Sequence, residues 1–262
     1  YVFKTQMGET TIHVTSLKVL SKSVRPLPVV KESTDEQGDS TKHDVFSNKE
    51  LKYRRRYIDL IVNPESREIF RKRSSIINEI RNILNEKNFL EVETPILQPI
   101  YGGASARPFK TFHNTLDIPL YLRIANELYL KRLIVGGFEG VFEFAKDFRN
   151  EGMSRFHNPE FTQCEFYVAY KDYVWMMDFI EDMFKRIVKK VCGSTKVSCG
   201  ENKIDFEKKW ERYSMYEAIE KFTSVDVSEM DEDSIRKVCK DMNVKVDKSM
   251  GRGKLIDEIF GE

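Results

Sequence analysis

An arginine and several carboxylates stand at strand-like spacing near the middle of this sequence. Arg149 and Glu151 are two residues apart, and beyond a polar loop Glu165 and Tyr167 are again two residues apart. Side chains at that spacing share one face of a β-strand, and the alternate positions, which are mostly apolar, would face the core. A guanidinium can bind two phosphate oxygens at once, and a carboxylate can bind an ammonium group. The spacing therefore predicts a hairpin that binds a phosphate ester and an amine, although it also fits a half-buried hairpin with a solvated outer face.

Three runs of residues carry a resemblance to a known family. They are residues 148–151 together with 161–167, residues 123–132, and residues 157–162. The first run reads Phe-Arg-x-Glu, then a loop, then a second strand, and it resembles the second signature motif of the class II aminoacyl-tRNA synthetases. The other two runs are similar to those of the lysine-specific enzymes of the bacterial type. The resemblance covers nearly the whole chain.

This resemblance implies an enzyme that activates L-lysine with ATP and then transfers lysine to tRNA(Lys). The lysine carboxylate would attack the α-phosphate, so a fixed cation would stabilise the transition state and no nucleophilic side chain would be needed. By resemblance, Arg149 is that catalytic cation and bridges the two reacting groups. The implied ATP contacts are Arg149, Glu151, His157, Asn158 and Phe161, with Phe161 stacking on adenine, and the implied lysine contacts are Gly103, Glu127, Arg149, Glu165 and Tyr167.

Selection of lysine requires a negative pocket for its ε-ammonium group, and Glu165 with Tyr167 suits that task. A buried carboxylate is costly unless it is paired, so such a site can reject uncharged analogues by roughly 10⁴–10⁵-fold. By resemblance, Glu127 holds the α-amino group and the backbone at Gly103 approaches the substrate. The residue before this glutamate is usually proline or threonine in the family, whereas here it is Asn126.

Three other hypotheses share some of these residues. An aspartyl or asparaginyl enzyme has the same motifs but must bind a shorter acidic or amide side chain, for which Glu165 is a poor partner. A paralogue that attaches lysine to a translation factor lacks the OB-fold that residues 1–28 resemble. A non-catalytic synthetase-like RNA-binding or regulatory module needs no adenylate site. The presence of the site residues argues against it: Arg149, Glu151, Glu127 and Glu165.

The composition, 40% hydrophobic and 32% charged with a net charge of +1, is typical of a globular protein. No apolar run approaches the roughly 20 residues of a membrane span, and no signal peptide is visible. The four cysteines show no metal-binding spacing and indicate reduced thiols in the cytoplasm. Residues 49–73 hold nine basic and four acidic side chains, a pattern that fits either phosphate contacts or a solvated helix face.

The predicted fold class is α+β, a class II catalytic domain with an antiparallel β-sheet flanked by helices and preceded by the tail of an OB-fold barrel. We expect four segments: OB-fold strands of an anticodon-binding domain (1–28), a polar linker (29–51), the first half of the catalytic domain (52–200), and a hairpin with a helical insertion (201–262).

The apolar residues after Asn63 and Pro64 recur at helical spacing and predict a long helix, which a strand over residues 89–94 follows. This pair resembles the first class II motif, which implies a homodimer. Farther on, Ser214 and Glu217 form a capping-box pattern.

The third class II motif is absent from the sequence. By resemblance, that motif and its surroundings supply the Mg²⁺ ligands and an arginine for the γ-phosphate. We therefore expect no metal ligands within this chain, and we expect a polypeptide that ends at Glu262 to be inactive.

Overall fold

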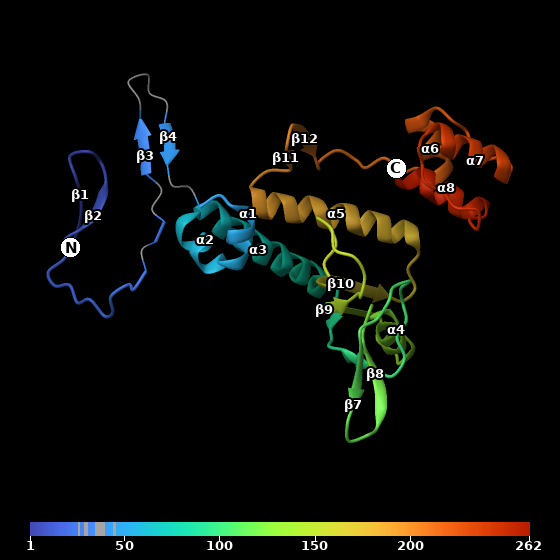
Figure 1. Ribbon diagram of the computed structural model, residues 1–262, viewed down its shortest axis with the longest axis horizontal. Helices are drawn as coiled ribbons and strands as arrows, with labels where there is room; N and C mark the ends of the chain where they lie inside the picture. Colours follow the sequence, from blue (N-terminus) through green and yellow to red (C-terminus); the bar gives the residue numbers. More distant parts are fainter. Residues whose placement is uncertain (26, 29–30, 35–39, 44–45) are drawn as a thin grey trace. The chain divides into compact units, whose positions relative to one another are not determined.

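The computed structural model describes residues 1–25, 27–28, 31–34, 40–43 and 46–262, and these fall into two compact units (Figure 1). The first unit spans Tyr1–Ala169 and the second Tyr170–Glu262. Helices combine with mostly antiparallel sheets, so the predicted α+β class is confirmed. The elements of the first unit are β1 (Val2–Lys4), β2 (Thr10–Ile12), β3 (Lys31–Thr34), β4 (Ser40–His43), α1 (Lys49–Arg54), α2 (Arg56–Val62), α3 (Pro64–Glu86), β5 (Leu90–Glu91), β6 (Leu97–Gln98), β7 (Lys110–His113), β8 (Ile118–Leu122), α4 (Glu127–Val135), β9 (Gly140–Phe148) and β10 (Glu160–Val168).

Two short hairpins begin the chain. β1 pairs antiparallel with β2, as the alternation of the first twenty residues predicts. Within the predicted linker, β3 pairs antiparallel with β4, although no apolar alternation pointed to strands there. Residues 29–30, 35–39 and 44–45 of that linker lie outside the described residues.

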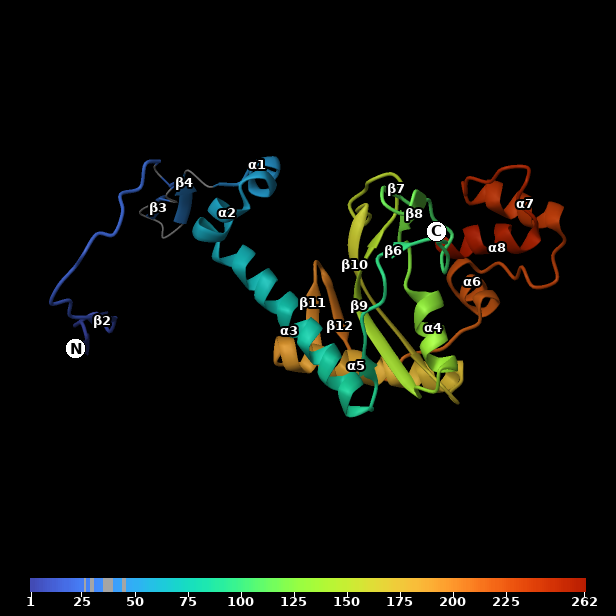
Figure 2. The same cartoon turned by 90° about the horizontal axis from the view of Figure 1, so that it is seen from below.

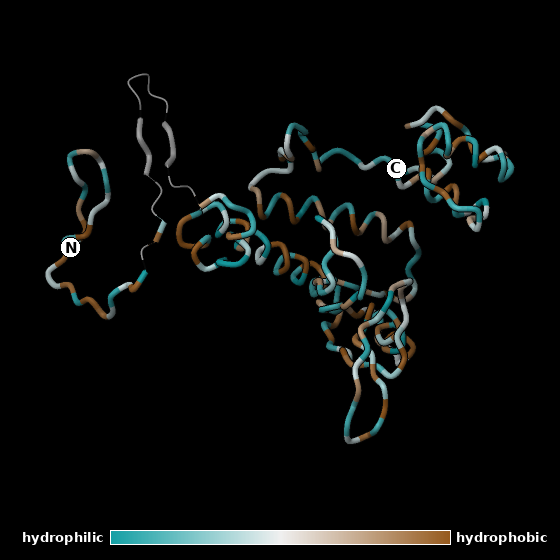
Figure 3. Tube along the Cα trace, in the orientation of Figure 1, coloured by the Kyte–Doolittle hydropathy of each residue, from teal (hydrophilic) through white to brown (hydrophobic). Residues whose placement is uncertain are grey.

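The long helix α3 begins at Pro64, as predicted, but Asn63 does not cap it with its side chain. The Asn63 amide instead donates to Asp59 Oδ1 at 2.7 Å and to the Phe46 carbonyl at 3.3 Å. Short hydrophobic and hydrophilic stretches alternate along the trace of α3 in Figure 3. Its last turns bury Ile83 and Leu84, so only this end of the helix is anchored in the core of the unit.

The central sheet has the order β10–β9–β5, and Figure 2 shows β9 beside β10. β9 and β10 pair antiparallel along their whole length, with Phe148 opposite Glu160 and Gly140 opposite Val168, which confirms the predicted hairpin. β5 joins β9 in parallel and is shorter than the predicted strand over residues 89–94. Helix α4 packs on β9 and β10.

The alternative of a half-buried hairpin with a solvated outer face does not hold for β9. Both faces of β9 are covered: Phe142 on one face is fully buried, and Glu143 and Asp147 on the other face are also buried. The strand ends at Phe148, so Arg149 lies just beyond it. Two carboxylates are tolerated on the second face, beside the buried Val141 and Ala145, because ion pairs and hydrogen bonds from neighbouring segments compensate for their burial.

A second sheet of order β6–β8–β7 lies in the same unit. Its strands are antiparallel, and Leu97 pairs with Leu122 where β6 meets β8. The chain leaves β8 directly into Arg123, whose backbone N–H donates to the Ile96 carbonyl at 2.9 Å. The second sheet thus fixes the segment that leads to α4.

The second unit is a long helix, a hairpin and a helical cluster. Its elements are α5 (Tyr173–Cys192), β11 (Lys196–Cys199), β12 (Asn202–Asp205), α6 (Met215–Thr223), α7 (Glu232–Asp241) and α8 (Arg252–Gly261). The predicted capping box is present at the start of α6, where Ser214 and Glu217 exchange hydrogen bonds. Helices α6–α8 enclose an apolar core that includes Ile219, Ile235 and Leu255. Among the described helices of both units, none combines the length and apolar character needed to cross a bilayer.

Candidate active site

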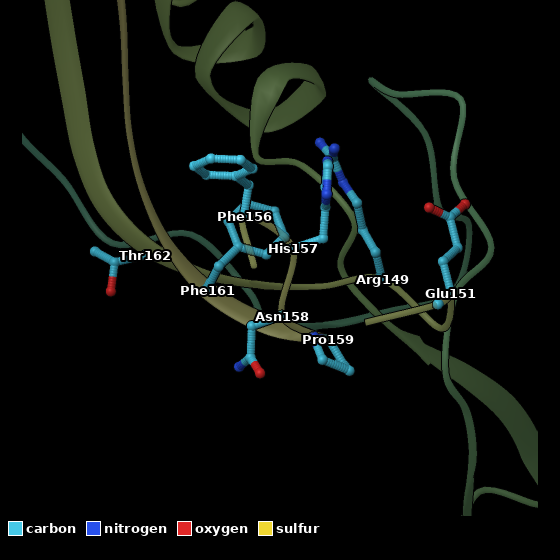
Figure 4. Close-up of a pocket in the computed structure, with 9 residues that line it drawn as sticks. Arg149, Glu151, Phe156, His157, Asn158, Pro159, Phe161 and Thr162 are labelled. Carbon is cyan, nitrogen blue, oxygen red and sulfur yellow. The ribbon is translucent and has the colours of Figure 1, made fainter. Parts of the chain in front are cut away.

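The loop between β9 and β10 forms a pocket of about 440 Å³, a size suited to a small ligand. Figure 4 shows Arg149 and Glu151 pointing to the same side of this loop. All five side chains predicted to contact ATP line the pocket, together with four that sequence reasoning missed. The lining residues are Arg149, Glu151, Gly152, Phe156, His157, Asn158, Pro159, Phe161 and Thr162.

Arg149 is positioned by the end of the hairpin. Its N–H donates to the Pro159 carbonyl at 2.8 Å, which continues the strand pairing beyond β9. Its Nε donates to the Ile124 carbonyl at 3.4 Å, and its guanidinium carbon lies 5.0 Å from the centre of the Phe161 ring. The terminal nitrogens of this cation have no carboxylate partner among the described ion pairs, so the group is able to bind an anion.

The other pocket residues are held by contacts within their own loop and by the segment before β7. Ser154 Oγ lies 2.7 Å from His157 Nδ1, and the Asn158 amide donates to the Glu160 carbonyl at 2.5 Å. The Glu151 carboxylate accepts a hydrogen bond from the backbone N–H of Arg107 at 3.1 Å. These contacts restrict the side chains before any ligand arrives, which reduces the entropy lost on binding.

Glu165 and Tyr167 lie next to each other on the same face of β10. The Tyr167 hydroxyl donates to Glu165 Oε1 at 2.5 Å, and the Gln163 amide, a partner that the sequence argument missed, donates to Oε2 at 2.7 Å. Burial and the neighbouring carboxylate raise the pKa of Tyr167, so its hydroxyl keeps its proton. Both donors are neutral, and Glu165 has no cationic partner among the described ion pairs. The two hydrogen bonds therefore fix the orientation of this carboxylate, but no cation of the described ion pairs neutralises its negative charge.

Gly103 and Glu127 lie against each other, as their predicted roles require. Gly103 has φ +86°, and a Cβ built on it would lie 2.9 Å from the Glu127 Cβ. Glu127 Oε1 already forms an ion pair with the ammonium group of Lys131, at 2.6 Å. The same ammonium lies 5.7 Å from the centre of the Tyr167 ring, so Glu127 and Tyr167 share one neighbourhood.

The same unit contains a buried ionic cluster that the sequence argument missed. Arg123 donates to Glu143 Oε1 at 2.7 Å, and Arg123 Nε lies 3.2 Å from Asp147 Oδ1. Neither oxygen of Asp147 accepts a hydrogen bond from a described residue. Burial raises the pKa of Asp147 to about 6, with Arg123 opposing and Glu165 adding to the shift. The clue was available, because Glu143 and Asp147 have the same strand parity as Arg149.

No group of three His, Cys, Asp or Glu side chains that could hold a metal ion occurs in the described part of the chain. All four cysteines are free thiols.

Comparison with known proteins adds to this geometry. Residues 48–250 match the family model described as "tRNA synthetases class II (D, K and N)". Over its full length the chain is 57% identical to a lysine–tRNA ligase of Porphyromonas gingivalis strain ATCC 33277, which it covers to 44%. It is 55% identical to the enzyme of that name from Azobacteroides pseudotrichonymphae genomovar. CFP2, covered to 51%, and 56% identical to that of Christiangramia forsetii, covered to 45%. The chain thus spans about half the length of the curated relatives that it matches.

Proposed function

The chain belongs to the class II tRNA synthetase family of the D, K and N group, and from this membership we propose that it is part of a lysine–tRNA ligase. The whole protein would activate L-lysine with ATP to lysyl-adenylate and pass the lysine to tRNA(Lys) in the cytoplasm. The observation that carries the choice of lysine is Glu165, a half-buried carboxylate held by Gln163 and Tyr167 without a compensating cation.

This arrangement suits the ε-ammonium of lysine. A ligand ammonium would supply the missing charge, and it would add a charge-assisted hydrogen bond to a carboxylate that needs no reorientation. Aspartate would bring a second negative charge against Glu165, and asparagine would leave that charge uncompensated. The relatives' names agree with this choice of substrate.

The adenylation step would use Arg149 and the pocket around it. In our proposal the Arg149 guanidinium bridges the lysine carboxylate and the α-phosphate, and it stabilises the charge that builds on the phosphate oxygens as pyrophosphate leaves. Adenine would take the place above Phe161, with Glu151, His157 and Asn158 as further contacts to ATP. Glu127 would bind the α-ammonium beside Gly103. Mg²⁺ would help to neutralise the triphosphate, with ligands from outside these residues.

The proposed homodimer rests on the exposed part of α3. Ile69 and Phe70 are 67% and 46% exposed, although both belong to the apolar stripe of this helix. Apolar side chains that a helix leaves exposed along one stripe are suited to an interface between subunits. In the full-length protein, Ile69→Asp should shift the sedimentation coefficient from that of a dimer toward that of a monomer, and an unchanged coefficient would remove this part of the proposal.

Amino-acid-dependent ATP–pyrophosphate exchange by the full-length protein tests the proposed reaction. We expect exchange with lysine and none with aspartate or asparagine at equal concentrations. Exchange with aspartate or asparagine, and not with lysine, would identify that amino acid as the substrate instead. Absence of exchange with all three amino acids, with ATP still bound, would favour a non-catalytic synthetase-like module.

A further inference from the structure

Glu143 joins three segments of the first unit at one buried carboxylate. Its Oε1 accepts hydrogen bonds from Arg123 Nη1 at 2.7 Å and from the Thr94 N–H at 3.2 Å. Its Oε2 accepts from Thr94 Oγ1 at 2.6 Å and from Asn126 Nδ2 at 3.1 Å. The three segments are β9, the turn after β5, and the residues between β8 and α4, so this carboxylate fixes their mutual placement.

Asn126 occupies the N-cap position of α4, yet its side chain does not cap the helix. Asparagine at this position usually accepts a hydrogen bond from the first turn. Here the amide points away from the helix to Glu143, and the residue is completely buried. The helix therefore gives up a side-chain cap, and its first residue is tied to β9 instead.

The first residue of α4 is Glu127, the proposed partner of the lysine α-ammonium. The segment that carries Asn126 also contacts the end of β9. The Phe148 N–H donates to the Arg123 carbonyl at 2.9 Å, and Arg149 Nε donates to the Ile124 carbonyl at 3.4 Å. One short segment thus relates the start of α4 to the proposed phosphate-binding arginine.

From these contacts we propose that Asn126 is a positioning residue for lysine, which acts through Glu127 by tying the start of α4 to Glu143. This inference rests on the proposed function and deepens it. The Asn126 amide touches no substrate. It sets the place of the Glu127 carboxylate, and a shift of that carboxylate would weaken its hold on the α-ammonium. Arg149 keeps its backbone hydrogen bond to the Pro159 carbonyl, so the ATP pocket in the β9–β10 loop stays intact.

The test compares two substitutions of nearly the same size in the full-length protein. Asn126→Leu removes the donor altogether. Asn126→Asp places a second carboxyl group against Glu143, and two such groups share one proton, so the donor is restored only at lower pH. Asn202→Leu, at an exposed position of β12 in the second unit, controls for the asparagine-to-leucine change itself.

We expect Asn126→Leu to raise the KM for lysine in pyrophosphate exchange by roughly three- to tenfold, the equivalent of one hydrogen bond, with the KM for ATP unchanged. Asn126→Asp should raise the KM for lysine at least as much at about pH 8, where the two carboxylates repel each other, and return toward the parent protein at about pH 6. Equal rises of both KM values, or a lysine KM like that of Asn202→Leu, would overturn the inference. Failure of the unsubstituted protein to exchange with lysine would instead overturn the proposed function.

Discussion

Replacing Glu143 with glutamine should destabilise the central sheet of the first unit severely. Glu143 is 3% exposed and accepts four hydrogen bonds, two on each oxygen. Glutamine has one acceptor oxygen and one NH₂ group. Turned one way, the NH₂ group faces Arg123 Nη1 and the Thr94 N–H; turned the other way, it faces Asn126 Nδ2, while the Thr94 hydroxyl can reverse and accept. In either case the buried Arg123 loses its shortest ion pair.

The size of the effect follows from the burial of both partners. Arg123 and Glu143 have side chains that are 3% and 4% exposed, and breaking such a pair by removing one charge costs about 3–5 kcal/mol. Glu91→Gln is the matched control. Glu91 also binds an arginine through two hydrogen bonds, to Arg81 at 2.7 and 3.0 Å, but its side chain is 35% exposed. Pairs of this kind contribute about 1 kcal/mol or less.

Hydrogen exchange of the β9 and β10 amides, followed by mass spectrometry across a urea series, measures the stability of this sheet. Fluorescence is unsuitable because both tryptophans, Trp175 and Trp210, belong to the second unit. The free energy of opening should fall by about 3–5 kcal/mol for Glu143→Gln and by less than about 1 kcal/mol for Glu91→Gln. Similar losses for the two variants would refute the idea that the cluster is an energetic centre of the unit.

The other predictions concern the titration of Asp147, a steric clash at Gly103 and the reactivity of two cysteines. Asp147 has a folded-state pKa of about 6, against 3.8 for the ordinary group, so its contribution to stability falls by about 3 kcal/mol as pH rises between these values. The stability of Asp147→Asn relative to the parent protein should therefore rise by that amount between about pH 4 and 7. A stability difference that does not change with pH would contradict this prediction. Gly103→Ala should raise the lysine KM more than Gly137→Ala, because both glycines have positive φ but only the first meets neighbouring atoms; equal kinetics would exclude the clash. Burial raises the pKa of Cys164 to about 12, so iodoacetamide at pH 8 should label the exposed Cys192 and leave Cys164 intact, as peptide mapping would reveal.

Local patterns predicted the elements of this chain well where one property dominated. The proline after Asn63 and the apolar repeat gave the start and length of α3, and Ser214 with Glu217 gave the start of α6. The β9–β10 hairpin followed from its alternation and loop. The β3–β4 pairing did not, because its strands have no apolar alternation.

The same distinction applies to the candidate site, where partners close in the sequence were predictable and distant ones were not. Short-range partners were accessible from the sequence: Glu165 and Tyr167 are two residues apart and do hydrogen-bond. Long-range partners were not, because the contacts of Glu143 reach back 20 and 49 residues to Arg123 and Thr94. A period-two rule also assumes that polar positions face water, and that assumption fails where ion pairs compensate for burial, as on the second face of β9.

The central claim is that Glu165 selects lysine by its charge. The most direct test compares lysine with norleucine, which has a similar chain and no ammonium group, in pyrophosphate exchange by the full-length protein and its Glu165→Gln variant. The account predicts that the parent prefers lysine by roughly 10⁴-fold or more and that the variant loses most of this preference while its KM for ATP is unchanged. An unaltered preference in the variant would contradict the account and place the recognition of the ε-ammonium elsewhere.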